Sequence, residues 1–236
     1  MPKLAKRIAA NREKHDSDKR YSLADAAEGV KSCATTKFDE SVDLAFLLGV
    51  DPRHADQMVR GSVSLPHGTG KQVRVVVLCK SDAQVQEAKD AGADEVGDDD
   101  VIQRISDGWT DFDSLVAAPD MMGQVGKLGR VLGPRGLMPS PKAGTVTPNV
   151  GQAVTDIKKG KIDYRVDKNA NIHVPIGKAS FAAEQIAENA GTVIEAVIKA
   201  RPAAVKGTYL KACCLSSTMG PGFRLDPTAL VTDFSN

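Results

Sequence analysis

The chain has 236 residues, of which 26% are charged and 4% aromatic, and its formal net charge is +1. That length predicts one or two domains with an ordinary core, and cysteines at positions 33, 79, 213 and 214 lack the spacing of a zinc site or redox motif. No apolar run reaches the ~18 residues of a membrane span and the start lacks a signal-peptide pattern, so we expect a cytoplasmic protein with reduced thiols.

Charge is segregated along the chain. Residues 81–120 hold 12 acidic and 2 basic residues, whereas residues 121–158 hold 5 basic residues and 1 acidic residue. A segregated basic surface is typical of a nucleic-acid-binding protein. A near-neutral net charge for the whole chain is not typical of such proteins, so composition alone does not decide whether the chain binds nucleic acid.

The first 65 residues alternate helix and strand signals. The basic start, to about residue 14, permits a helix, and Ser22 has the form of a cap for a helix over 22–34. Apolar residues at every second position predict strands over 41–48 and 59–65. Strands that are apolar on one face only are typical of antiparallel sheets.

An aromatic residue lies at the entrance of the first strand. Phe38 follows Lys37, and two interpretations are open. The ring is either a core-edge aromatic or an exposed platform for a nucleotide.

The middle of the chain has a different pattern. Residues 73–79 form a nearly continuous apolar run, as expected for a strand buried on both faces. Helices are predicted over 81–91, 98–107 and 149–158, with short strands over 94–96 and 114–118. This alternation predicts a small parallel sheet with helices on both sides.

One glycine-rich stretch, residues 122–146, differs from all others. It holds six glycines, three prolines and four basic residues (Lys127, Arg130, Arg135 and Lys142) and no carboxylate. Each glycine weakens a helix by about 1 kcal/mol relative to alanine, and proline stops one, so we expect close backbone approach and bare amides rather than a strong helix. The stretch is either a phosphate-facing loop or a tightly packed turn.

The last third returns to the first pattern. Residues 162–166 and 171–176 resemble a hairpin joined through 167–170, followed by an amphipathic helix over 181–200 and a strand over 208–215. Because the two ends share one pattern and the middle has another, we infer that the middle domain is inserted into a domain made from both ends.

The sequence lacks the motifs of the enzyme and metal sites that we considered. Gly68-Thr-Gly-Lys71 lacks the first glycine and the Ser/Thr of a phosphate loop, and the histidines are isolated. The acidic run at 98–100 is explained by the dipole of the helix that it opens. We therefore predict no catalytic residues, no cofactor and no metal.

The remaining residues have the chemistry of a polyanion site. They are Lys37 and Phe38, the pair His173 and Lys178, the loop from Ser217 to Pro221, and the glycine-rich stretch. Hydroxyls, amides and lysines bind phosphate and ribose oxygens, and apolar side chains cover sugar or base faces. Few aromatic residues are present for stacking along a single strand, which favours a structured RNA recognised by shape.

Several segments match one family in the same order. They include Leu65-Pro-His-Gly-Thr-Gly-Lys-Gln-Val73, Leu132-Gly-Pro-Arg-Gly-Leu-Met-Pro139, Gly177-Lys-Ala-Ser-Phe181 and Ser217-Thr-Met-Gly-Pro221. Over residues 1 to about 226 the sequence closely resembles the bacterial large-subunit ribosomal protein L-one family. Phe223 departs from that pattern, where a smaller aliphatic residue is usual, and the tail 228–236 extends beyond the common end.

The resemblance implies an α/β protein of two domains. A discontinuous RNA-binding α+β domain (1–66 and 160–236), with a split β-α-β antiparallel sheet, is interrupted by an inserted three-layer α/β Rossmann-like domain (67–159). The implied role is a ribosomal one: binding the mobile stalk of the large-subunit rRNA, assisting release of deacylated tRNA from the exit site, and repressing translation of the protein's own operon through its mRNA. We expect a monomer when free.

The resemblance also implies site residues. The principal RNA site would comprise Lys37, Phe38, Glu40, His173, Lys178, Ser217, Thr218, Met219 and Gly220. The basic residues of the glycine-rich stretch would be secondary RNA contacts. The alternative hypothesis is an enzyme acting on a phosphate substrate or nucleotide held by residues 122–146.

Overall fold

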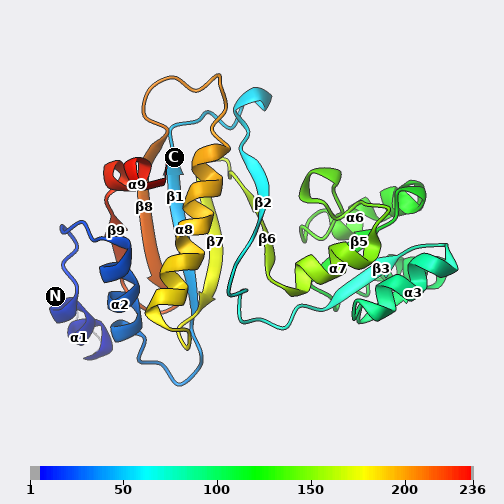
Figure 1. Ribbon diagram of the computed structural model, residues 1–236, viewed down its shortest axis with the longest axis horizontal. Helices are drawn as coiled ribbons and strands as arrows, with labels where there is room; N and C mark the ends of the chain where they lie inside the picture. Colours follow the sequence, from blue (N-terminus) through cyan, green and yellow to red (C-terminus); the bar gives the residue numbers. More distant parts are fainter. Residues whose placement is uncertain (1–5, 235–236) are drawn as a thin grey trace. The chain divides into compact units, whose positions relative to one another are not determined.

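The computed structural model describes residues 6–234, without the side chain of Lys142, and forms two compact units (Figure 1). One unit holds the described residues up to Gly70 and those from Ile162 onward, and the other runs from Lys71 to Lys161. Residues 1–3, where the family resemblance begins, lie outside the described part. Within that part, no helix is long and apolar enough to cross a membrane.

The first unit combines a four-stranded sheet with helices. Its elements are α1 (Lys6–Lys14), α2 (Leu23–Cys33), β1 (Ser41–Leu48), η1 (Ala55–Gln57), β2 (Arg60–Ser64), β6 (Lys161–Arg165), β7 (Asn171–Lys178), α8 (Ala183–Lys199), β8 (Leu210–Ser217), β9 (Gly222–Leu225) and α9 (Pro227–Phe234). The helices over 22–34 and 181–200 and the strands over 41–48 and 208–215 are thus confirmed within two residues. Neither β9 nor α9 was predicted from the sequence.

The strand order in this sheet is β7-β1-β8-β9. β1 pairs antiparallel with both β7 and β8, so that Ala45 lies opposite His173 on one side and Cys214 on the other. Because β7 and β8 are each antiparallel to β1, they are parallel to one another, and α8 connects them. This is a split β-α-β arrangement, with β1 inserted between the two parallel strands.

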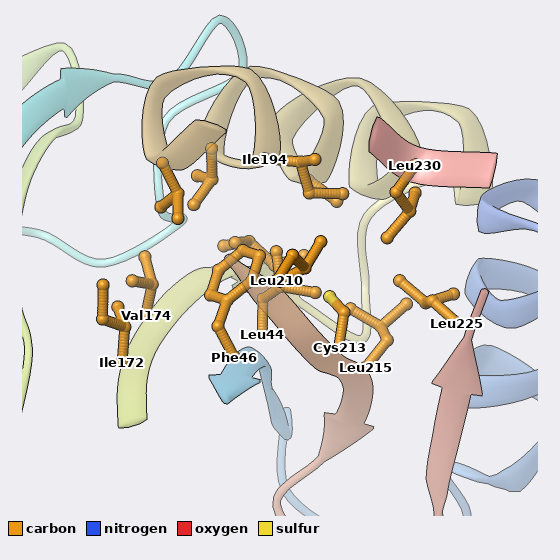
Figure 2. Close-up of a cluster of buried hydrophobic side chains, with 14 of the residues drawn as sticks. Leu44, Phe46, Ile172, Val174, Ile194, Leu210, Cys213, Leu215, Leu225 and Leu230 are labelled. Carbon is orange, nitrogen blue, oxygen red and sulfur yellow. The ribbon is translucent and has the colours of Figure 1, made fainter. Parts of the chain in front are cut away.

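Alternate residues of β1 build the core of the first unit. Val42, Leu44, Phe46 and Leu48 are all at most 2% exposed, as the period-two pattern predicts. Figure 2 shows Leu44 and Phe46 beneath Ile194 of α8, with side chains of β7, β8, β9 and α9 around them. Burying each such side chain contributes about 1.5–3 kcal/mol. The other face of β1 carries the residues that bear on the site.

A glycine in α2 accommodates the unusual Phe223. A Cβ at Gly29 would lie 2.3 Å from Cε1 of Phe223. The ring also meets His15 edge-on at 4.8 Å and Tyr21 at 5.2 Å between ring centroids. The larger side chain is therefore packed between α2 and the segment that follows α1.

The expected hairpin over 162–176 is wrong. The turn itself exists, because the carboxylate of Asp167 accepts hydrogen bonds from the amides of Asn169 (2.8 Å) and Asn171 (2.7 Å). The strands on either side of it do not pair with each other: β6 joins β2 in a separate two-stranded sheet, and β7 joins β1. Pairing with the long apolar strand β1 buries Ile172 and Val174 completely, which the hairpin alone could not do.

The second unit is built on a short parallel sheet. Its elements are β3 (Val75–Leu78), α3 (Asp82–Asp90), β4 (Glu95–Gly97), α4 (Asp99–Ser106), β5 (Ser114–Ala117), η2 (Pro119–Met121), α5 (Met122–Val125), η3 (Gly126–Leu128), α6 (Gly129–Leu132), η4 (Pro141–Ala143) and α7 (Val150–Lys158). The strand order is β4-β3-β5, and both pairs are parallel. All four residues of β3 are buried, as the continuous apolar run predicts.

The strand order places helices on both faces of this sheet. The chain passes from β3 to β4 through α3, and then back past β3 to β5 through α4. Because crossovers between parallel strands are right-handed, this reversal puts α3 and α4 on opposite faces. α7 packs against α3, and α4 contacts η3. The unit therefore has three layers.

The glycine-rich stretch is more helical than expected. It forms the single turns α5 and α6 with η3 between them, and after Pro134 it is helical only in the short 3-10 turn η4. A Cβ at Gly123, Gly126 or Gly129 would meet nothing within 4 Å, so these glycines are not explained by close packing within the unit. Gly136 and Gly144 do have positive φ angles, 71° and 72°, which favour glycine.

A buried amide secures the segment where the chain leaves the first unit. Asn189 of α8 is fully buried and accepts a hydrogen bond from the amide of His67 at 3.1 Å. Its Nδ2 donates to the carbonyl oxygens of Gly68 (3.0 Å) and Ile176 (2.7 Å). The side chain thus joins the 67–68 segment, α8 and β7.

Candidate nucleic-acid interface

The loop from Ser217 to Pro221 begins where β8 ends, beside the start of β1. The amide of Thr218 donates to the carbonyl oxygen of Ser41 at 3.0 Å, and the amide of Ser41 donates to Oγ1 of Thr218 at 3.1 Å. The amide of Gly220 closes a turn onto the carbonyl of Ser217 at 3.2 Å. A Cβ at Gly220 would lie 2.4 Å from Oγ of Ser217, so the turn fits glycine alone without a shift.

A buried carboxylate holds this loop. Glu40 is 1% exposed. Its Oε2 accepts hydrogen bonds from Oγ of Ser217 at 2.8 Å and from the amide of Met219 at 2.9 Å, and its Oε1 accepts one from Oγ1 of Thr36 at 2.9 Å. Burial raises the pKa of Glu40, but these hydrogen bonds outweigh that effect and hold the pKa below its ordinary value. The loop is fixed by an ionised group.

This geometry changes the role expected for Glu40. The resemblance places it among the RNA-binding residues, but its side chain lies beneath the loop with no surface to offer a ligand. Glu40 is therefore a positioning residue. The amides of Met219 and Gly220 also point inward, to Glu40 and Ser217, so they do not serve as phosphate donors as the sequence suggested.

Two large apolar side chains stand out beside the loop. Phe38 is 55% exposed and Met219 is 48% exposed, the highest values among the large hydrophobic residues that the structure describes. The core-edge interpretation of Phe38 is therefore wrong. Its segment is held by Oγ1 of Thr36, which lies 3.0 Å from the carbonyl oxygen of Phe38 and shares its one proton between that oxygen and the Glu40 carboxylate. The amide of Ser180 also donates to the Asp39 carboxylate at 3.1 Å. An ordered backbone thus presents the exposed ring.

Of the basic residues predicted for the site, some lie near the loop from Ser217 to Pro221 and one lies far from it. Lys178 lies opposite Ser41 at the end of β7, and its Nζ donates to Oγ of Ser41 at 3.0 Å. Lys37 is exposed next to Phe38. His173 is exposed but lies opposite Ala45, four residues further along β1, which at ~3.3 Å per residue is roughly 13 Å from the loop. The structure groups Lys37 and Lys178 with the loop and places His173 on the open sheet face.

An acidic residue lies on that same face of β1. Asp43 lies opposite Pro175 in β7 and Ser216 in β8. Burial raises the pKa of Asp43, and the nearby charges of His173 and Lys178 lower it by less. A carboxylate here opposes the approach of phosphate, so the positive surface is interrupted between His173 and the loop.

Sequence reasoning missed two residues that shape the loop. Thr36 bonds to both Phe38 and Glu40, and Arg7 of α1 donates from Nη1 to the carbonyl oxygen of Met219. The basic, helix-permissive start of the chain was a signal for α1. Nothing in the sequence indicates its contact with a loop more than 200 residues away.

The secondary residues lie in the second unit. Lys127 and Arg130 are exposed on η3 and α6, beside the glycines whose Cβ positions are open. Nη1 of Arg135 donates to Oγ1 of Thr110. The side chain of Lys142 lies outside the described part of the structure. Lys127 and Arg130 are thus exposed, but no contact among the described residues orients them on a ligand.

The described residues show neither a metal-binding cluster nor a phosphate loop. No group of three or more His, Cys, Asp or Glu side chains is arranged to hold a metal ion. Gly68 and Gly70 lie in a linker and not at a strand-to-helix turn, and Nζ of Lys71 binds Asp113 at 2.5 Å. The site around Glu40 offers a rigid apolar and basic surface with hydroxyl acceptors, which is chemistry for binding and not for bond cleavage.

Comparison with known families supplies the assignment. Residues 30–221 match the model of the ribosomal protein L1p/L10e family, and this range includes Phe38, Glu40 and the loop from Ser217 to Pro221. The match covers most of the 236 residues. The chain therefore belongs to the ribosomal protein L1p/L10e family, and it is an rRNA-binding structural protein of the large ribosomal subunit and not an enzyme.

Proposed function

We propose that the surface formed by Phe38, Lys37, Lys178 and the loop from Ser217 to Pro221 binds the mobile stalk of the large-subunit rRNA. The observation that carries this proposal is the ionised, buried Glu40, which fixes a loop that carries the exposed Met219 and whose neighbouring segment carries the exposed Phe38. A preformed loop loses little conformational freedom on binding. Exposed Phe38 and Met219 suit sugar and base faces, and the lysines suit phosphates.

The same surface supports two further roles. Bound to the stalk, the protein assists release of deacylated tRNA from the exit site. When present in excess over rRNA, it binds an rRNA-like element in its own mRNA and represses translation of its operon. Because both RNAs would use one site, each should displace the other. The working form is a cytoplasmic monomer when it is free of the ribosome.

The two compact units correspond, in this proposal, to an RNA-binding domain made from both ends of the chain and an inserted domain. The inserted domain adds weaker contacts to rRNA or tRNA through Lys127, Arg130, Arg135 and Lys142. Support for this part is the exposed, basic, glycine-lined surface of α5, η3 and α6. The main affinity comes from the first unit.

A filter-binding titration tests the proposal. Labelled stalk RNA is titrated with protein from about 50 to 300 mM salt, and the leader of the protein's own mRNA is then added as competitor. We expect tight binding whose logarithm falls linearly with the logarithm of salt concentration, and mutual displacement of the two RNAs. Weak retention that is equal for unrelated RNAs would refute stalk recognition. Failure of the leader to displace the stalk would refute only the regulatory role.

The tRNA role needs a separate measurement. Ribosomes lacking this protein are compared with ribosomes to which it has been restored, and dissociation of labelled deacylated tRNA from the exit site is timed. We expect faster dissociation after restoration. Equal rates would contradict the assistance of tRNA release and leave the stalk assignment intact.

A further inference from the structure

A groove of about 1090 Å³ adjoins the loop that carries Met219. It lies between α1, the segment from His15 to Tyr21, and residues Met219 to Pro221. Clefts for small molecules measure roughly 300–1,000 Å³, so this groove is at the upper limit for a single small ligand. Its open form and its mixed polar and apolar lining suit a segment of a polymer.

The groove is held in shape by contacts of α1. Arg7 donates to the carbonyl of Met219. Nδ2 of Asn11, which is 7% exposed, donates to the carbonyl of Cys33 at 3.4 Å, and Nε2 of His15 lies 3.0 Å from the carbonyl oxygen of Gly222. The helix is therefore attached both to α2 and to the loop of the proposed RNA site.

The charged residues of the groove are mainly basic. Arg7, Arg12, Lys14 and Lys19 line it, against the acidic Glu13 and Asp16. Arg12 and Lys19 are exposed, and neither forms a salt bridge with another residue in the described part of the chain. Nζ of Lys19 lies 5.0 Å from the centre of the ring of Tyr21, which also lines the groove. These cations are available to an anionic ligand.

The groove is continuous with the proposed RNA site. Met219 and Gly220 belong to both, so a strand seated on Met219 would meet the groove next. The family match begins at residue 30, so α1 lies before the matched residues. The groove therefore uses residues of α1 that lie outside the range matched by the family model.

We infer that the groove between α1 and the loop from Ser217 to Pro221 binds the sugar-phosphate backbone of the same RNA that Phe38 and Met219 contact. Arg12 and Lys19 neutralise phosphates there, and Arg7 and His15 keep the groove in place. The inference rests on the proposed stalk-binding function. Because the contacts are to phosphate, they add affinity and salt dependence but no sequence preference.

The test is a salt titration of a groove variant. Arg12→Gln/Lys19→Gln is compared with wild type and with Lys31→Gln/Lys206→Gln, which makes the same charge change at exposed residues outside the groove. All three proteins first show matching thermal unfolding. Each phosphate contact contributes a slope of about −0.7 to −0.9, so we expect the groove variant, which loses two contacts, to bind the stalk about 10- to 100-fold more weakly at 0.1 M salt and to have a slope shallower by about 1.4 to 1.8.

The outcomes separate the two proposals. If wild type binds the stalk tightly and the groove variant keeps the wild-type slope and affinity, the groove does not bind RNA, and an acidic protein partner would then be the better occupant. If the control variant loses as much stalk affinity as the groove variant, the loss is caused by the change in net charge, and the groove assignment is overturned. If stalk binding by the wild type itself shows no steep salt dependence, the proposed stalk-binding function is refuted, and the groove inference that rests on it is refuted with it.

Discussion

The ring of Phe223 occupies the space that a side chain at Gly29 would need, with Cε1 2.3 Å from the position of a Cβ. A large residue on β9 is therefore matched to a glycine on α2, two elements that pack together. We expect Gly29→Ala to lower the free energy of unfolding by about 1–3 kcal/mol through overpacking, despite a gain of up to about 1 kcal/mol in helix propensity.

Urea unfolding of a double-mutant cycle checks this relationship. In a Phe223→Leu background, Gly29→Ala should be neutral or stabilising, because the clash is gone. Gly123→Ala is the control: a Cβ there meets nothing within 4 Å, so only the helix-propensity gain remains. Equal stability of wild type and Gly29→Ala would mean that the ring moves aside without penalty.

The buried carboxylate of Glu40 predicts a pH dependence of stability. The pKa of Glu40 in the folded protein lies below its ordinary value of 4.5, so its contribution to stability is present above pH 4.5 and is lost as the pH falls through the folded pKa. Glu40→Gln should lose about 1–3 kcal/mol of unfolding free energy near neutral pH, and the difference in unfolding free energy from wild type should narrow as the pH falls below about 4.5. Chemical denaturation at several pH values measures this.

The matched control is Glu28→Gln on the exposed face of α2, which should stay within about 0.5 kcal/mol of wild type. Glu40→Gln should also weaken stalk binding, because the loop loses its ionised anchor. A gap that stays constant across the pH range would show that Glu40 is not ionised in the fold.

The exposed side chains should matter for binding and not for stability. Phe38→Ala and Met219→Ala should each weaken stalk binding by about 1–3 kcal/mol, the scale of a base-aromatic or buried apolar contact. Unfolding free energies should change little, because the side chains are 55% and 48% exposed. Val231→Ala, at a residue 38% exposed on α9, is the control and should change neither quantity appreciably. Unchanged RNA affinity of both site variants would remove them from the interface.

Removal of an acidic residue should strengthen binding. Asp43→Asn takes away a carboxylate between His173 and Lys178, so phosphate should approach this face more easily. We expect affinity for stalk RNA to rise about two- to five-fold at low salt, with a smaller gain at high salt. Asp233→Asn on α9 makes the same charge change away from the site and should have a smaller effect. Weaker binding by Asp43→Asn would mean that the carboxylate orders the site.

The first unit should bind the stalk without the second. Residues 71–161 are replaced by a short Gly/Ser linker from Gly70 to Ile162, which keeps His67 and Gly68 bonded to Asn189. Stalk affinity should largely survive in filter binding, provided that circular dichroism shows a folded protein. Loss of affinity in a folded variant would move the main site to the glycine-rich stretch.

The elements with a clear period were predictable, and their partners were not. Alternation over 41–48 and the continuous apolar run over 73–79 identified β1 and β3, because burial on one or both faces leaves a pattern in the residues themselves. No pattern within β6 indicates which strand it pairs with. Its partner, β2, lies about 100 residues earlier in the chain. β9 has only four residues, too few for a periodic signal.

The candidate site was found by chemistry and by resemblance, but its internal organisation was hidden. Hydroxyls, lysines and an aromatic residue could be named from the sequence. The role of Glu40 depends on donors at positions 36, 217 and 219, and the last two lie 177 and 179 residues away. No local pattern reports a hydrogen bond across that separation.

The hydrogen bonds of the Asn189 side chain bear on the order in which the two units of this protein can fold. The side chain binds residues 67–68, where the chain leaves the first unit, to α8, which is formed by residues that follow the second unit in the sequence. β2, before the second unit, likewise pairs with β6, which follows it. Synthesis of the first unit therefore cannot be completed until the second has been made. During translation the early strands must wait for α8, so the inserted unit has time to fold first.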